Sequence, residues 1–187
     1  MLWSRIAERE GINMEERKRN LLKQLETFFK EDEDIEEASL FTGEELEAPM
    51  DVLRVLVTGY GPALIDVLAE YSFIPMPGEV QEVWYFSCVL TIETDIPREG
   101  AVALSNAIAR LNFYMPYGGF CLSPDGKMLT YKSVTVLRSD EKDETLYKDM
   151  ELSADTALLI PENFTDSLLR IADGRLPLRE FIEMLPQ

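Results

Sequence analysis

The chain has 187 residues, of which 46% are hydrophobic and 10% aromatic, so it can bury a core without the help of a metal or of disulfides. Its 35 acidic and 18 basic residues give a net charge of -17, which repels phosphate backbones and anionic lipids, so neither nucleic acid nor a membrane is expected as a partner. The sequence contains no histidine, which excludes Ser–His–Asp triads, Cys–His pairs and the usual zinc sites.

The N-terminal segment is predicted to form two helices. Residues 2–10 fit a short helix that Gly11 would end. Asn13 followed by Glu16 is a capping-box-like pair, which marks the start of a second helix. Leucines and phenylalanines at helical spacing then extend this second helix over residues 14–30.

The stretch EDEDIEEA, residues 31–38, is interpreted as the beginning of a solvated linker that continues to Pro49. Asp32, Asp34 and Glu36 alternate in the way that calcium ligands sometimes do. The stretch lacks the glycine and the final glutamate that an EF-hand loop needs, so a cation site is the less favoured alternative.

Three strand candidates follow the linker. Residues 52–58 are rich in β-branched side chains. Residues 64–73 alternate with a period of two, although Pro62 and a 3.6-residue spacing also fit a helix; we favour the strand. The clearest strand covers residues 83–92. Trp84 and every second residue after it are apolar, so this face is predicted to be core, whereas the opposite face is half polar, as on a sheet covered on one side.

The next helix, between Pro97 and Pro116, is apolar on two opposite sides. Its wide stripe is predicted to lie on the sheet and consists of Ala101, Leu104, Ile108, Leu111 and Met115. Its narrow stripe, formed by Val102, Ala109 and Phe113, is the candidate protein interface, because a helix that is apolar on both sides is usually buried on both sides. The alternative is that the C-terminal helices of the same chain fold back over the narrow stripe.

The remainder of the chain is predicted to form a hairpin, a loop and two helices. Residues 120–122 and 128–137 are strands joined by the turn SPDG. Residues 138–149 are polar and are interpreted as a loop. A helix follows after Ser153, and Pro177 opens the last one.

This order of elements predicts an α+β fold. The expected sheet is antiparallel, built from a three-stranded meander plus a hairpin, with helices packed on one face. Residues 1–48 hold the N-terminal helices and the acidic linker, and residues 49–187 hold the α+β domain with its C-terminal helices. Because the helix at 14–30 is expected to pack on the second part, the chain is effectively one domain.

No residue is singled out as catalytic, cofactor-binding or metal-binding, and no cofactor is expected. Cys88 and Cys121 each lie in a strand-like apolar run and are predicted to be buried, structural and unpaired. The start of the chain has no apolar signal-peptide core, and no apolar run approaches the ~20 residues of a membrane span. A reduced, cytoplasmic location is therefore expected.

The segment Asp95–Leu137 resembles the bacterial YbjN-like family and the type III secretion chaperone-like fold with which that family is grouped. The similar residues are YGGFCLSPDGKMLTYKSVTVL at 117–137, after the helix ALSNAIARLN at 103–112. As an order of elements, the resemblance extends over residues 14–173. It implies a protein-binding fold that is often dimeric, and it implies no catalytic residues. The acidic linker and the long tail after Asp140 depart from the family.

The leading hypothesis is a non-enzymatic, cytoplasmic, chaperone-like or adaptor protein that binds other proteins as a homodimer. A small-molecule-sensing regulatory domain, with a pocket between the 97–116 helix and the sheet, is the alternative. An enzyme that uses a carboxylate pair is the third hypothesis. A flat exposed apolar patch would favour the first, a concave apolar pocket with convergent polar groups the second, and buried acids with raised pKa values the third.

Overall fold

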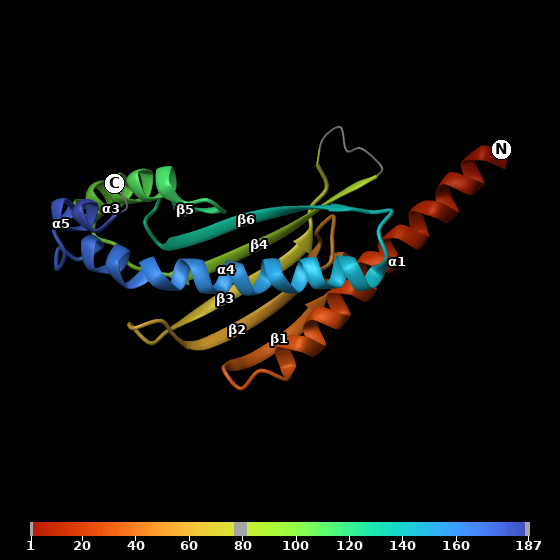
Figure 1. Ribbon diagram of the computed structural model, residues 1–187, viewed down its shortest axis with the longest axis horizontal. Helices are drawn as coiled ribbons and strands as arrows, with labels where there is room; N and C mark the ends of the chain where they lie inside the picture. Colours follow the sequence, from red (N-terminus) through yellow and green to blue (C-terminus); the bar gives the residue numbers. More distant parts are fainter. Residues whose placement is uncertain (1, 77–81, 186–187) are drawn as a thin grey trace.

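The computed structural model describes residues 2–76 and 82–185, with side chains from residue 14 onward. The chain forms an α+β fold around a six-stranded antiparallel sheet in the order β1-β2-β3-β4-β6-β5 (Figure 1). The strands are β1 (Ile35–Phe41), β2 (Val52–Tyr60), β3 (Ile65–Phe73), β4 (Val83–Glu93), β5 (Gly119–Leu122) and β6 (Met128–Arg138). The helices are α1 (Leu2–Lys30), α2 (Gly43–Leu46), α3 (Arg98–Tyr114), α4 (Asp143–Ala172) and α5 (Leu178–Met184).

The predicted meander is β2-β3-β4, and the predicted hairpin is β5-β6, which joins the meander through the pairing of β6 with β4. The predicted α+β fold class is confirmed, and residues 65–73 form a strand rather than a helix. The turn SPDG closes the hairpin, with Gly126 at a φ of 74° and its N–H donating to the Ser123 carbonyl.

The acidic stretch 31–49 was wrongly predicted to be a linker. It contains the edge strand β1, which pairs with β2, and the short helix α2, which begins with a capping box between Thr42 and Glu45. Most of the carboxylates precede β1, and the two within it, Glu36 and Glu37, are exposed, so the acidic run is compatible with strand pairing. Ala38 supplies the one fully buried side chain of β1.

One face of the sheet forms the core. In β4 the predicted core face is confirmed, since it is buried throughout from Trp84 to Ile92. Helices α1 and α4 cover this face: α4 packs on β4 and β6, and α1 packs on β1, β2 and β3 (Figure 1). Residues from both predicted parts of the chain, such as Leu21 and Phe181, share this single core.

Contrary to the prediction, the wide stripe of α3 does not lie across the face of the sheet, which α3 meets at its edge strand β5. Its central residues Leu104, Ile108 and Leu111 are buried, but α3 packs against α4, α5 and β5. The reason is the connection between β4 and α3. Thr94 and Ile96 donate backbone hydrogen bonds to the β5–β6 turn, so the chain has passed the end of the sheet before α3 begins. Figure 1 shows α3 and α5 together at one end of the molecule.

Two helix boundaries also differ from the predictions. α1 is a single helix that continues through Gly11 and Asn13, because an interior glycine costs a helix only about 1 kcal/mol and an existing turn already satisfies the backbone N–H groups that a cap would serve. α4 begins at Asp143, so most of the predicted loop 138–149 is helical. Two carboxylates in its first turn, Asp143 and Glu144, favour a helix start there.

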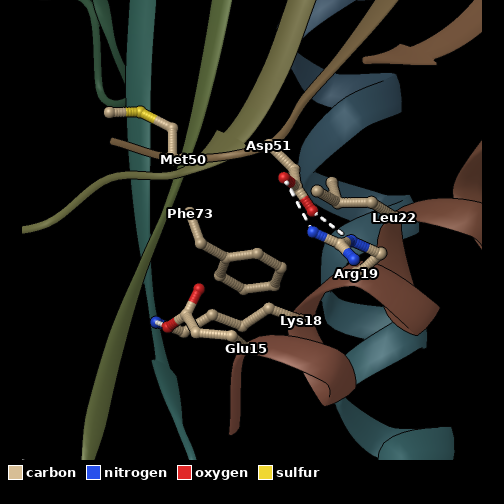
Figure 2. Close-up of a pocket in the computed structure, with 7 residues that line it drawn as sticks. All are labelled: Glu15, Lys18, Arg19, Leu22, Met50, Asp51 and Phe73. Carbon is tan, nitrogen blue, oxygen red and sulfur yellow. Dashed lines mark hydrogen bonds and ion pairs between the residues drawn. The ribbon is translucent and has the colours of Figure 1, made fainter. Parts of the chain in front are cut away.

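Two arginines fix α1 to the rest of the fold. Arg19 forms a two-pronged ion pair with Asp51, at 2.6 and 3.3 Å, beside the ring of Phe73 (Figure 2). Asp51 also accepts the backbone N–H of Gly43 at 2.8 Å, so this one carboxylate joins α1, the start of α2 and the start of β2. Arg17 lies 5.1 Å from the centre of the Trp84 ring and pairs with Asp143 at the start of α4.

Candidate functional site

The predicted interface residues of α3 are exposed. Val102 is 66% exposed and Phe113 is 82% exposed, and Ala109 lies exposed between them. We call Val102, Ala109 and Phe113 the α3 strip. The C-terminal helices α4 and α5 do fold back onto α3, but they bury its wide stripe and leave the α3 strip uncovered. Coverage of the strip by the tail of the same chain was therefore the wrong alternative, and coverage by a partner stays a prediction.

The end of α3 that carries Phe113 is held firmly. Asn112 makes two hydrogen bonds of 2.9 Å with the backbone of Phe120, donating from Nδ2 to its carbonyl and accepting its N–H at Oδ1. The neighbouring Leu111 is buried in the core. These contacts fix the backbone just before Phe113, whose exposed ring lies edge-to-face against Tyr114 at 5.2 Å.

The charge of α3 differs in sign from that of the whole chain. The helix contains two arginines, Arg98 and Arg110, and one glutamate, Glu99, which gives it a net charge of about +1 in a chain of -17. The surface around the α3 strip is therefore less repulsive to a second acidic protein than the average surface of this molecule.

The open face of the sheet is more mixed in character. Val134 and Val136 are exposed on β6, but Lys132 lies beside them on the same strand face. Across the sheet the same face carries the ion pair between Arg54 and Glu70, at 2.9 Å. Alternating charges and single valines do not make a continuous apolar surface.

A cavity of about 300 Å³ lies where α3, α4 and α5 meet, near the α3 strip. Its lining is almost entirely apolar and consists of Leu111, Tyr114, Met115, Pro116, Ile160, Asn163, Phe164 and Leu185. The alternative hypothesis predicted a pocket between this helix and the sheet, whereas this cavity lies between α3, α4 and α5. Leu111 and Met115 were predicted as part of the wide stripe, but sequence patterns did not join them to the other lining residues, because these residues come from three separate segments and each resembles ordinary core.

The two cysteines differ in their surroundings. Cys88 is buried in the core, and burial raises the pKa of its thiol to about 12, so it stays a protonated thiol at neutral pH. Cys121 is exposed on β5, where it faces the open side of the sheet, so the prediction that it is buried was wrong. Helices α1 and α4 cover the other face of the sheet, so a side chain on this face is left in solvent. Both thiols are free.

One carboxyl among the described residues has a raised pKa. Partial burial raises the pKa of Asp155 on α4, and the nearby charges of Glu151 and Asp32 add to the effect. It is not the buried pair of acids that the enzyme hypothesis requires. Within the described part of the chain, no group of three or more acidic or cysteine side chains is placed to hold a metal ion. No helix there has the length and apolarity needed to cross a bilayer.

Comparison of the sequence with protein-family models and with curated proteins gave no match. The resemblance to the YbjN-like family and to the secretion chaperone-like fold therefore remains a prediction.

Proposed function

We propose that this chain is a non-enzymatic, cytoplasmic, chaperone-like or adaptor protein that binds other proteins, and that it forms a homodimer through the α3 strip. The observation that carries the proposal is the exposure of Val102 and Phe113 on one face of a helix whose opposite face is buried in the core. An exposed aromatic side chain on an anchored helix is typical of an interface, because an aromatic ring buries a large apolar area against a partner.

Two further features support a second copy of the chain as the partner. The strip runs along one helix, so two copies related by a two-fold axis can bury the same residues against each other. The helix is locally basic although the chain is acidic, which reduces the repulsion that two copies would otherwise meet.

The substitution Ala109→Glu tests this proposal. It places a carboxylate in the middle of the strip, where a dimer would have to desolvate it. Leu152→Glu is the matched control, since Leu152 is 67% exposed on α4, away from the strip, and the substitution adds the same charge. Sedimentation velocity should show a dimer for the native chain and for Leu152→Glu, and a monomer for Ala109→Glu with an unchanged circular dichroism spectrum.

Two results would contradict the proposal. If the native chain sediments as a monomer at all accessible concentrations, it forms no homodimer and the proposal is wrong. A dimer that survives Ala109→Glu uses another surface, and the α3 strip is then merely exposed. If Ala109→Glu were to unfold the chain, Phe113→Ser offers a second variant, because Phe113 is mostly exposed and its loss leaves the core untouched.

A further inference from the structure

The cavity between α3, α4 and α5 has a buried floor and an open mouth. Leu111 and Leu185 are only 1% and 6% exposed and form its floor. Phe164 is half-buried and contributes to the wall. Tyr114 and Asn163 are exposed and lie at the mouth. The space is therefore a recess that a molecule can enter from solvent.

The size of the recess sets the size of its occupant. Its volume of about 300 Å³ lies at the lower end of the range of small-molecule pockets, roughly 300–1,000 Å³. An apolar cavity of about 150 Å³ accommodates benzene. Twice that volume leaves room for a bicyclic aromatic ring system or an alkyl group of similar bulk.

The lining sets the polarity of the occupant. None of the residues that line the recess carries a charged side chain, so an ionic ligand would lose its hydration without gaining an ion pair. Water is also held weakly there, because a buried water needs two to four polar partners and the floor and walls offer almost none. An apolar molecule that displaces such water is bound favourably.

Of the two polar side chains in the lining, Tyr114 and Asn163, the amide of Asn163 is held in one orientation. Asn163 donates a hydrogen bond from Nδ2 to the Leu159 carbonyl at 2.9 Å, one turn earlier in α4. This bond orients the side-chain amide, and Oδ1, which has no hydrogen-bond partner among the described residues, can accept a hydrogen bond from a ligand. A donor on the ligand would meet this oxygen at the mouth, while the apolar body occupies the interior.

We propose that this recess binds a neutral, largely apolar small molecule about the size of a bicyclic aromatic, with one hydrogen-bond donor directed at Asn163. The proposal goes beyond protein binding by the α3 strip and does not depend on it, since none of the three strip residues lines the recess. It assigns to the fold a ligand class whose recognition is steric and apolar rather than ionic.

Calorimetric titration of the full chain with 1-naphthol tests the proposal, with naphthalene-1-sulfonate as the charged analogue of the same ring. The variant Ile160→Phe fills the recess from its wall. The matched control is Leu159→Phe, one residue away on the same helix and exposed. We expect 1-naphthol to bind the native chain and Leu159→Phe with equal Kd, and Ile160→Phe at least tenfold more weakly. The sulfonate should bind at least tenfold more weakly than 1-naphthol.

A second variant probes the polar end and stands in if Ile160→Phe fails to fold. Asn163→Leu changes an exposed residue and removes the accepting oxygen. It should raise the Kd of 1-naphthol about fivefold, which is the effect of losing one ordinary hydrogen bond, and leave the Kd of naphthalene unchanged.

Several outcomes would overturn the inference. Absence of 1-naphthol binding removes the ligand site altogether. Equal binding of the sulfonate refutes the neutral ligand class, and undiminished binding to a folded Ile160→Phe places the ligand elsewhere. If Asn163→Leu also weakens the binding of naphthalene, which has no hydrogen-bond donor, then the loss does not come from the proposed hydrogen bond. None of these results alters the sedimentation of Ala109→Glu, so failure of this inference is distinguishable from failure of the dimer.

Discussion

At the scale of single residues, a stack of three aromatic rings fastens α1 to the sheet. Phe29 of α1 stacks on Tyr71 of β3 at 5.2 Å, and Tyr71 stacks on Phe86 of β4 at 6.2 Å. All three side chains are almost completely buried. Because a protein interior is close-packed, loss of any one ring leaves a void that its neighbours fill only in part.

Phe86→Ala is therefore expected to lower the free energy of unfolding by about 3–5 kcal/mol. Val89→Ala is the control: it lies on the other face of the same strand, half-buried, and should cost less than about 1 kcal/mol. Urea unfolding followed by circular dichroism gives both values. A loss below about 1 kcal/mol for Phe86→Ala would contradict the central position of this ring.

Tyr71 and Tyr131 form a natural pair for testing buried hydroxyls. The Tyr71 hydroxyl has no hydrogen-bond partner among the described residues, and burial raises its pKa well above the usual value. The Tyr131 hydroxyl donates to the Tyr117 carbonyl at 2.8 Å. Tyr71→Phe should leave the free energy of unfolding unchanged or raise it by up to about 1 kcal/mol, whereas Tyr131→Phe should lower it by about 1 kcal/mol. Equal losses in urea melts would show that Tyr71 does have a partner.

At the scale of elements, α3 and α4 approach each other at Gly100. A Cβ atom at this position would lie 1.8 Å from the Ala172 carbonyl oxygen, well inside van der Waals contact with backbone. The glycine is thus required by the crossing of the two helices, even though its φ is unremarkable.

Gly100→Ala should reverse the usual effect of this substitution. In an open helix, alanine stabilises by about 1 kcal/mol relative to glycine, but here we expect a loss of about 1–3 kcal/mol because the helices must separate. Ser105→Ala, at an exposed position of the same helix, should change stability little. A thermal melt in which Gly100→Ala gains stability would show that α3 and α4 can move apart freely.

The elements that could be predicted are those whose own residues determine them. The alternation along β4 and the SPDG turn gave a strand and a hairpin, because half-burial and turn geometry are local properties. β1 was missed because an edge strand has little burial to reveal it. For α3, both stripes were found, but periodicity does not identify the surface against which a stripe packs. The recess escaped prediction entirely, since residues distant in sequence form it.

At the scale of the whole molecule, charge governs association. A net charge of -17 opposes contact between two copies near neutral pH, and the repulsion falls as the pH approaches the isoelectric point of about 4.3. Light scattering between pH 7 and pH 5 should therefore rise, and should rise less for Ala109→Glu than for Leu152→Glu. A flat profile for the native chain would show that repulsion does not limit association.

The fold itself should survive this pH range. Burial alone would raise the pKa of Asp51, but its hydrogen bonds to Arg19 and to the Gly43 N–H lower it below the usual value. Ionised Asp51 therefore stabilises the fold in full above the usual aspartate pKa, and this stabilisation is lost only as the pH falls through the lowered pKa. Asp155 behaves in the opposite way. Because its pKa is raised, protonation as the pH falls removes the cost of keeping this carboxylate charged in a partly buried place. Circular dichroism at pH 5 should thus match that at pH 7.

The order of the strands has a consequence for synthesis on the ribosome. β6 occupies the position between β4 and β5, and α4, which covers β4 and β6, comes after all six strands in the chain. As the chain emerges from its N-terminus, the apolar face of β4 must wait for residues 143–172 before it can be shielded. During that interval α1 can already lie beside Trp84, but the part of β4 that α4 covers, marked by the Cys88 thiol 3.9 Å from the Ser153 carbonyl, stays open to solvent and to neighbouring chains.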